Sequence, residues 1–275
     1  MKKVINLIRD NKDFNAINSL FKKRKEVYIN NTNEDNALLV LLGLFYENDE
    51  TIFIATPNLY KAQILYDKLS RVLEKDEICF YPQDEFLTNE LLVSSIEFKL
   101  ERINTIIKIL QNKKRIVITD LYGLLKPQFP RKKWEESRIE IKIENEYDLE
   151  WLKNKLIEYG YKKEYTVEKI GDFAIRGGIV DIFPVNSLVP YRIDFFGDQA
   201  DQIKTFNIDT QRSDVVVESF SIYPFTDFFY DESELNILLK TIEDKVAITN
   251  FSKDALDIIK DDKEKLKNRD ELERL

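Results

Sequence analysis

The residues that could bind a nucleotide follow a short apolar run near the N-terminus. Val27–Ile29 is predicted to be a strand and Asn36–Tyr46 a helix, which is the layout of a phosphate-binding loop. Such a loop needs glycines that turn backbone N–H groups onto the phosphates, a lysine for the β- and γ-phosphates, and Ser or Thr for magnesium. The connecting residues contain no glycine, no lysine and two acids: Asn30, Asn31, Thr32, Asn33, Glu34 and Asp35. We therefore expect a degenerate loop that is kept as a scaffold and holds no cofactor.

A second candidate for nucleotide chemistry is Asp120, which follows the apolar run Arg115–Thr119. An acid at the end of such a strand binds magnesium in ATPases that carry a working phosphate loop. Since that loop is degenerate here, we prefer the commoner interpretation, in which Asp120 is the N-cap of a helix beginning at Leu121.

Composition excludes several other classes of enzyme. The chain of 275 residues contains no histidine, which removes histidine bases, histidine-activated nucleophiles and histidine metal ligands. The single Cys79 excludes a disulfide framework or a cysteine zinc cluster and fits a reducing cytoplasm. A formal net charge of −8 argues against non-specific DNA binding by the whole chain. No apolar run is long enough for a membrane span, so we expect a cytoplasmic protein with no membrane partner.

The elements that position these residues alternate between helices and strands up to residue 126. Continuous apolar strands between amphipathic helices predict a parallel sheet covered on both faces. The expected strands are 27–29, 51–55, 78–81 and 115–119, and the expected helices are two within 1–22, then 36–46, 59–73 and 94–110.

The pattern changes after Pro127 and Pro130, which mark a domain boundary. A strand at 138–143, a helix at 147–159 ended by Gly160 and closely spaced strands up to about Thr205 predict an α+β module with an antiparallel sheet. Beyond Ser219 we expect a return to helix, strand and helix, with the strand at 246–250. The predicted fold is an α/β parallel-sheet domain (1–126 and 214–275) interrupted by a smaller α+β domain (127–213).

The clearest local signal is a hairpin within Gly171–Pro184, where two strand-like runs flank Gly177–Gly178. A two-residue turn places four apolar side chains on one face, which should be core. It places the other four on the opposite face: Ala174, Arg176, Ile179 and Asp181.

A third strand, Tyr191–Phe196, extends this outer face. If its apolar residues point inward, the side chains that point outward beside Arg176 are Arg192, Asp194 and Phe196. Arginine and aromatic residues on an exposed face are typical of interaction hot spots. The alternative is that Arg192 and Asp194 form ordinary surface ion pairs and that Phe196 packs under the next loop. The pattern alone leaves both interpretations open.

These runs resemble a known family. Gly171–Pro184, Pro190–Asp198 and Asp209–Ser213 are similar to the N-terminal region of bacterial transcription-repair coupling factors (Mfd), which is related to the excinuclease protein UvrB. Matches upstream are Asn58–Gln63, Tyr81–Glu85 and the helix start at 95–102, so the resemblance covers most of residues 25–225. The Thr210–Ser213 run and the degenerate phosphate loop favour the coupling factor over UvrB.

The resemblance implies a RecA-like domain without ATPase residues and an inserted domain that binds the excinuclease protein UvrA. The family's binding residues correspond here to Arg176, Arg192 and Phe196, and Asp194 lies among them on the same face. The chain is then a non-catalytic N-terminal fragment that recruits UvrA during transcription-coupled nucleotide excision repair. The alternative is a fragment of an ATP-dependent damage-binding protein like UvrB.

The resemblance also implies partners that belong to a longer protein. ATP and magnesium are expected only in the motor of the full-length family protein, which also contacts RNA polymerase and DNA through other domains. A C-terminal domain of the same full-length chain is expected to mask the surface that binds UvrA.

Overall fold

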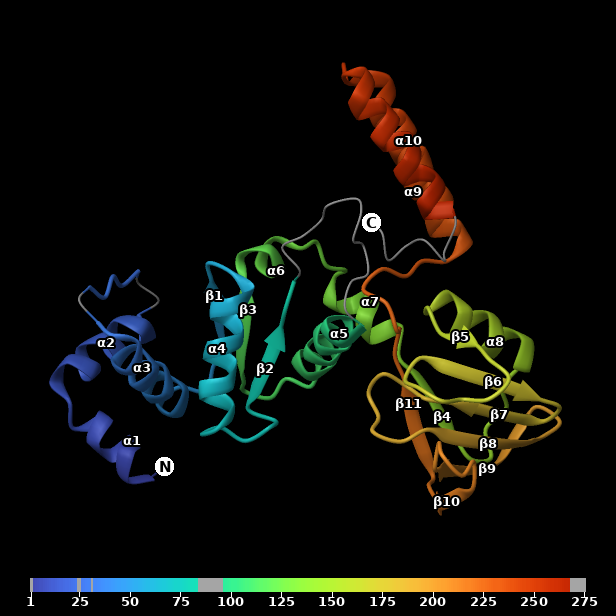
Figure 1. Cartoon of the computed structure of the whole chain (residues 1–275), viewed down its shortest axis with the longest axis horizontal. Helices are drawn as coiled ribbons and strands as arrows, with labels where there is room; N and C mark the ends of the chain where they lie inside the picture. The colour runs from blue at the N-terminus through green and yellow to red at the C-terminus, as the bar shows by residue number, and fades with distance from the viewer. Residues whose placement is uncertain (1, 24–25, 31, 84–95, 268–275) are drawn as a thin grey trace. The chain divides into compact units, whose positions relative to one another are not determined.

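The computed structural model describes residues 2–23, 26–30, 32–83 and 96–267. The residue contacts divide the chain into two compact units, Met1–Glu85 with Lys108–Lys126 and Phe86–Ile107 with Pro127–Leu275. The fold is mixed α/β, with a parallel sheet in the first unit and an antiparallel sheet in the second (Figure 1). Asn31, the predicted helix start at 94–95 and residues 268–275 lie outside the described residues, as do Asp84 and Glu85.

The first unit is built on a parallel sheet of three strands in the order β1-β3-β2. β1 spans Ile52–Thr56, β2 spans Ile78–Tyr81 and β3 spans Ile116–Asp120. Every residue of β2 and β3 is buried. The prediction of a buried parallel sheet from continuous apolar runs is therefore confirmed.

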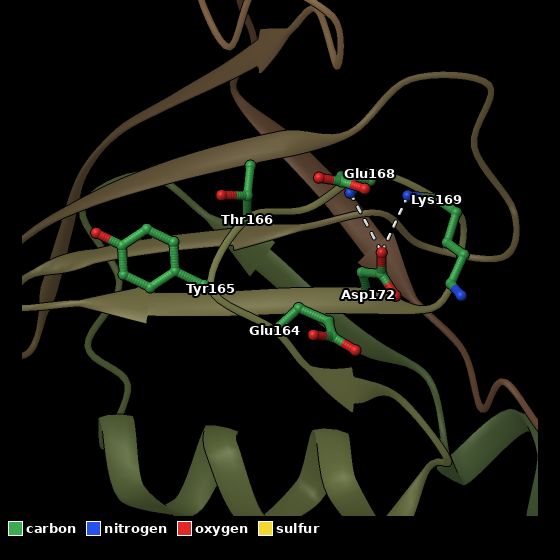
Figure 2. A pocket seen from close by; sticks show the side chains of 6 residues that line it. All are labelled: Glu164, Tyr165, Thr166, Glu168, Lys169 and Asp172. Atoms are coloured by element: carbon green, nitrogen blue, oxygen red, sulfur yellow. Dashed lines mark hydrogen bonds between the residues drawn. The ribbon is translucent and has the colours of Figure 1, made fainter.

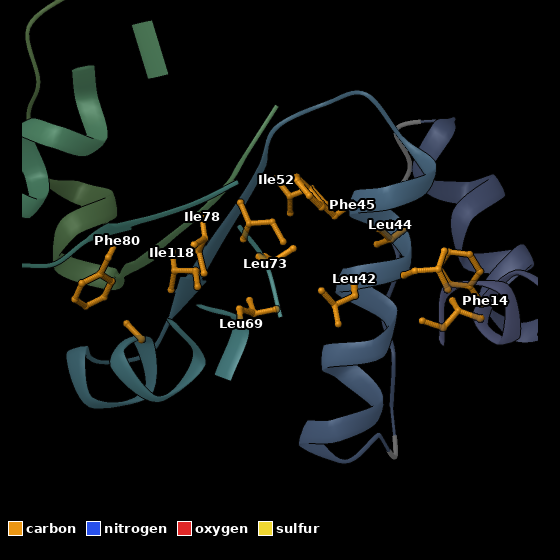
Figure 3. Packing of buried hydrophobic residues seen from close by; sticks show 14 residues of the cluster. Phe14, Leu42, Leu44, Phe45, Ile52, Leu69, Leu73, Ile78, Phe80 and Ile118 are labelled. Atoms are coloured by element: carbon orange, nitrogen blue, oxygen red, sulfur yellow. The ribbon is translucent and has the colours of Figure 1, made fainter. Parts of the chain in front are cut away.

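Helices of the first unit pack against this sheet and against one another. They are α1 (Lys2–Arg9), α2 (Lys12–Lys22), α3 (Glu34–Glu47), α4 (Leu59–Ser70) and α6 (Leu121–Leu125). α5 (Ile96–Leu110) is divided between the units after Ile107. Figure 3 shows the shared core, in which α3 contributes Leu42, Leu44 and Phe45 and α4 contributes Leu69.

The strand predicted at 27–29 is wrong. Residues 26–30 have no regular structure, and Tyr28 is 84% exposed. Residues with a high strand propensity form a strand where a neighbouring strand and a buried face are available. In the described part of the chain, no strand pairs with this run. The layout of a phosphate loop is thus missing its strand as well as its glycines.

The second unit contains a sheet of six strands in the order β10-β9-β8-β7-β6-β5. Neighbours pair antiparallel except β5 with β6. The strands are β5 (Lys162–Lys163), β6 (Asp172–Arg176), β7 (Ile179–Ile182), β8 (Tyr191–Phe196), β9 (Gln199–Phe206) and β10 (Ser213–Val216). A separate pair joins β4 (Ile139–Lys142) to β11 (Ser219–Ile222).

Two helices precede the six-stranded sheet, α7 (Arg131–Glu136) and α8 (Leu149–Glu158). α8 buries Leu152 and Leu156 completely. The helix ends at Gly160, whose φ is +81°, and the amide of Tyr161 donates to the carbonyl of Leu156 at 2.9 Å. This left-handed glycine end is the one that the sequence predicts.

The strand predicted at 246–250 is also wrong, because α9 (Glu232–Ile248) continues through most of it. A capping box between Asp231 and Glu234 begins the helix, and α10 (Lys253–Lys267) follows. Half-buried side chains recur at helical spacing along α9, and this periodicity overrides the β-branched run near its end. They are Leu235, Leu238, Leu239, Ile242 and Val246.

The hairpin between β6 and β7 closes on a two-residue turn, as predicted, because Arg176 pairs with Ile179. Gly177 has φ +60° and Gly178 does not have a positive φ, a pattern of type II′ turns that favours glycine first. The carbonyl of Gly178 accepts from the amide of Phe195 at 2.7 Å. A Cβ on Gly178 would lie 2.8 Å from the carbonyl oxygen of Phe195, so the turn and β8 are in close contact.

We expect Gly178→Ala to lower the free energy of unfolding by about 1–3 kcal/mol, because the new methyl group forces two backbones apart. Urea unfolding measures the loss, and hydrogen exchange at the Phe195 amide locates it. Gly197→Ala is the control for a turn substitution without a steric contact, because Gly197, unlike Gly178, has a positive φ but its Cβ would meet nothing within 4 Å. Exchange at Phe195 that is unchanged in Gly178→Ala would contradict the prediction.

Candidate functional site

The degenerate phosphate loop forms a helix cap. The side chain of Asn33 accepts from the amide of Asn36 at 2.8 Å, and Glu34 pairs with Lys68 at 2.8 Å. The hydrogen bond from Lys68 lowers the pKa of Glu34. Acidic residues in the first turn stabilise the helix but repel an anion from its N-terminus. The described residues therefore build a capped helix where a phosphate would otherwise bind.

Asp120 is a buried cap, as preferred from the sequence. One carboxylate oxygen accepts from the amide of Gly123 at 2.9 Å, at the start of α6. The other accepts from the amide of Gln83 at 3.0 Å. Both oxygens of this fully buried side chain are used to hold backbone in place.

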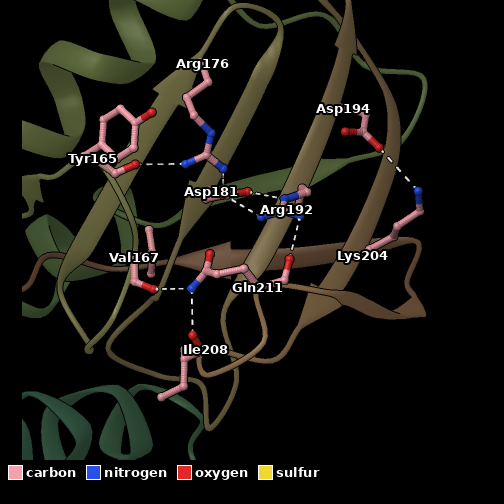
Figure 4. A network of polar contacts seen from close by, with 9 residues as sticks. All are labelled: Tyr165, Val167, Arg176, Asp181, Arg192, Asp194, Lys204, Ile208 and Gln211. Atoms are coloured by element: carbon pink, nitrogen blue, oxygen red, sulfur yellow. Dashed lines mark hydrogen bonds and ion pairs between the residues drawn. The ribbon is translucent and has the colours of Figure 1, made fainter.

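Register on the hairpin agrees with the predicted alternation. Phe173 pairs with Ile182 and Ile175 with Val180, and this face contributes to the core. β8 adds Arg192 opposite Asp181 on the other face (Figure 4). This second face is only partly solvent-exposed, because Asp181 and Ala174 are buried there.

A small apolar cluster covers part of the second face. Val167, Ala174, Phe183 and Phe206 are all buried and pack together. Val167 belongs to the loop before β6, and Phe206 ends β9. Both residues contribute buried apolar side chains beside the arginines, since the guanidinium of Arg192 lies 4.7 Å from the centre of the Phe206 ring.

Asp181 joins the two arginines on this face. Arg192 binds it with two hydrogen bonds, Nε to Oδ1 at 2.7 Å and Nη2 to Oδ2 at 2.9 Å, and Nη2 of Arg176 donates to Oδ2 as well. The Asp181 side chain is 0% exposed, whereas those of Arg192 and Arg176 are 17% and 37% exposed. A paired carboxylate of this kind is costly to leave alone, so it fixes both guanidinium groups.

Each arginine has a second anchor. Nη1 of Arg192 donates to the carbonyl of Gln211 at 3.1 Å, and its guanidinium lies 4.7 Å from the centre of the Phe206 ring. The hydrogen bond with Asp181 raises the pKa of Arg192. Nη1 of Arg176 donates to the carbonyl of Tyr165 at 2.9 Å. Both guanidinium groups are therefore held in fixed positions.

The other two predicted site residues lie farther along β8. Asp194 pairs with Lys204 at 3.4 Å and not with Arg192. Phe196 is 82% exposed beside the β8–β9 turn. The alternative interpretation is thus right for Asp194, which forms a surface ion pair, and wrong for Arg192, which pairs with a buried acid, and for Phe196, which is exposed.

Sequence reasoning missed the roles of Asp181 and Gln211. An acid in the middle of the apolar run Ile179–Ile182 was the available signal for Asp181, because a charge in a buried strand needs a partner. Gln211 has φ +56°, and its side-chain amide donates to the carbonyls of Val167 and Ile208. Nothing in its residue type predicts that conformation.

An open pocket is lined by residues of the loop before β6 and by Asp172, the first residue of β6 (Figure 2). Its lining residues are Glu164, Tyr165, Thr166, Glu168, Lys169 and Asp172. One oxygen of Asp172 accepts from the amides of Glu168 and Lys169 and so closes this loop. Among the residues that the structure describes, no group of three acidic, cysteine or histidine side chains could hold a metal ion.

No helix in the described ranges is long and apolar enough to cross a bilayer.

The cap at Asp120 predicts a loss of stability that a catalytic role would not. We expect Asp120→Ala to cost about 2 kcal/mol of unfolding free energy, because two buried amides lose their acceptor. Asp120→Asn should cost less, since its carbonyl can still serve one amide. Chemical unfolding measures both variants, and stability equal to that of the wild type in Asp120→Ala would contradict the cap.

The two arginines should contribute unequally to stability. Arg192→Ala should cost about 3 kcal/mol, because it removes two of the three hydrogen bonds on a buried carboxylate. Arg176→Ala should cost about 1 kcal/mol, since Asp181 then keeps its bidentate partner. Urea unfolding of the two matched variants tests the order, and equal losses would contradict it.

Comparison with known proteins identifies a family that is similar to the region containing this face. The UvrB interaction domain family matches residues 139–228, which include Arg176, Arg192, Asp194 and Phe196. Over 248 residues, 90% of this chain, the sequence is 29% identical to the transcription-repair-coupling factor of Bacillus subtilis. It is also 29% identical over 237 residues, 86% of this chain, to the one of Staphylococcus aureus strain USA300.

The chain spans only about a fifth of the length of these relatives, 21% and 20% respectively. The resemblance found in the sequence is confirmed, and UvrB is not favoured as the closer relation. Residues 139–228 are therefore similar to the UvrB interaction domain, and most of the chain is similar to a part of transcription-repair-coupling factors.

Proposed function

We propose that the chain is a non-catalytic docking region that recruits the excinuclease protein UvrA in transcription-coupled nucleotide excision repair. The observation that carries the proposal is the match of the UvrB interaction domain to residues 139–228. This range contains Arg176, Arg192 and Phe196, which together form the proposed docking face. The name of the relatives, transcription-repair-coupling factor, supports the same role.

The chemistry of the face suits a protein partner. Phe196 offers an exposed aromatic ring on a rigid strand, and aromatic residues are enriched among binding hot spots. Arg176 and Arg192 present guanidinium donors that are already held in place, so little side-chain entropy is lost on binding. Asp194 is half-buried and paired with Lys204, and we assign it a minor part in docking.

The proposal extends to the first unit, which we interpret as a degenerate RecA-like domain. Its parallel sheet supports that interpretation. From the sequence we assign 1–126 and 214–275 to the RecA-like domain and 127–213 to the inserted domain, whereas the residue contacts group 86–107 and 214–275 with the second unit. The acidic, glycine-free loop before α3 supports the absence of a nucleotide cofactor, and measurable ATP binding by the chain would favour a protein like UvrB instead.

The remaining partners belong to the whole protein. We propose that RNA polymerase, DNA, ATP and magnesium act through domains of the longer relatives, and that a C-terminal domain masks the docking face. We also propose a bacterial cytoplasmic location, which the relatives' organisms and their name support.

Phe196→Ala is the cleanest test, because an exposed side chain can be removed without disturbing the fold. We expect the affinity for purified UvrA to fall about 30-fold, which corresponds to about 2 kcal/mol for a hot-spot aromatic residue. Leu188→Ala is the matched control, since Leu188 is 96% exposed and precedes β8 at the opposite end. Isothermal titration gives both dissociation constants, and equal affinity of the two variants would contradict the proposal.

A further inference from the structure

Two guanidinium groups share a single carboxylate on the docking face. Asp181 is fully buried, and the described structure places Arg176 and Arg192 as its two basic partners (Figure 4). The neighbouring pair, Lys204 with Asp194, is balanced. The cluster therefore carries one positive charge more than its own acid neutralises.

The position of Arg192 depends on an unusual backbone as well as on Asp181. Gln211 is one of three described residues other than glycine with a positive φ, +56°, and its carbonyl accepts from Nη1 of Arg192. Its side chain holds this conformation through bonds of 3.1 Å to the Val167 carbonyl and 2.8 Å to the Ile208 carbonyl. Strained backbone of this kind persists where surrounding contacts fix it, and it is concentrated at functional sites.

These contacts leave donors on both arginines. The hydrogen bonds within the described structure use Nε, Nη1 and Nη2 of Arg192 once each, and they use Nη1 and Nη2 of Arg176 once each. Each Nη carries two hydrogens, so one remains on each, and Arg176 also keeps its Nε–H. Planar guanidinium donors in fixed positions match the geometry of a carboxylate.

We propose that Asp181 and Gln211 are positioning residues that hold Arg176 and Arg192 to receive one carboxylate side chain of the partner. The inference rests on the proposed function and adds the chemistry of the partner group. The bound acid completes a cluster of two guanidinium groups and two carboxylates. Asp181 and Gln211 act through the arginines and do not themselves touch the partner.

Asp181→Asn separates positioning from simple charge attraction because the two effects have opposite signs. The substitution removes a negative charge and makes the face more positive, so attraction alone predicts tighter binding to an acidic partner. Positioning predicts weaker binding, since the new amide turns a donor toward a guanidinium. We expect the affinity for UvrA to fall about tenfold.

Asp214→Asn is the matched control for charge. Asp214 is exposed on β10 of the same sheet, and its loss changes the net charge equally without altering the arginine contacts. Its affinity should equal or slightly exceed that of the wild type. Affinity of folded Asp181→Asn that equals or exceeds the Asp214→Asn value overturns the inference, and thermal melts establish folding.

If Asp181→Asn does not fold, Gln211→Gly tests whether the positioning of Arg192 affects binding. Glycine adopts the same φ without strain but loses both side-chain anchors, so the fold should be kept and binding should weaken. Unchanged binding by Gln211→Gly overturns the inference.

A measurement without the partner separates this inference from the proposed function. In the free wild-type chain, the Nε–H resonance of Arg192 should be resolved and protected from exchange, and Gln211→Gly should increase its exchange. If the wild-type chain fails to bind UvrA, the proposed function falls, while these resonances still test the positioning. An unprotected Arg192 resonance in the wild type overturns the positioning itself.

Discussion

The buried carboxylate of Asp181 is the interaction on which the docking face depends. It lies on β7, between Arg176 of β6 and Arg192 of β8, so its bonds tie three neighbouring strands together through side chains as well as backbone. A charge buried to this degree is tolerated because two guanidinium groups supply its hydrogen bonds. The same requirement fixes the arginines, and the surface that we propose for docking thereby gains rigid side chains. In that proposal, stability and recognition are coupled at one residue.

The turn and the loops around Asp181 help to place the two arginines beside its carboxylate. The Gly177–Gly178 turn sets the register that places Arg176 beside Asp181, and Gly178 allows β8 to approach closely. Val167 and Phe206 pack with Ala174 and Phe183 on this face, and the centre of the Phe206 ring lies 4.7 Å from the guanidinium of Arg192. The first unit shows the opposite use of acids. There Asp120 and Glu34 stabilise the starts of helices. Both residues stand where a nucleotide-binding protein would carry out its chemistry, but here they stabilise the backbone.

Much of this organisation was predictable because it follows from local patterns. Alternation and the two-residue turn gave the faces of the hairpin, Gly160 gave the end of α8, and Asp120 was identified as a cap. The two strand predictions at 27–29 and 246–250 failed because β-branched residues form strands only where a partner strand is present. The acid within the apolar run 179–182 indicated a buried charge at Asp181, but the conformation of Gln211 could not be predicted, since it depends on a contact with Val167 far away in the sequence.

Docking of UvrA on the face formed by Arg176, Arg192 and Phe196 can be observed without any substitution. Hydrogen–deuterium exchange of the whole chain with and without purified UvrA tests it most directly, because every described segment is observed at once. We predict protection in the peptides that cover the β6–β7 turn, β8 and the 206–213 loop, with no change in α3 or its capped N-terminus. Protection confined to the first unit, or none at saturating UvrA, would contradict docking through this face.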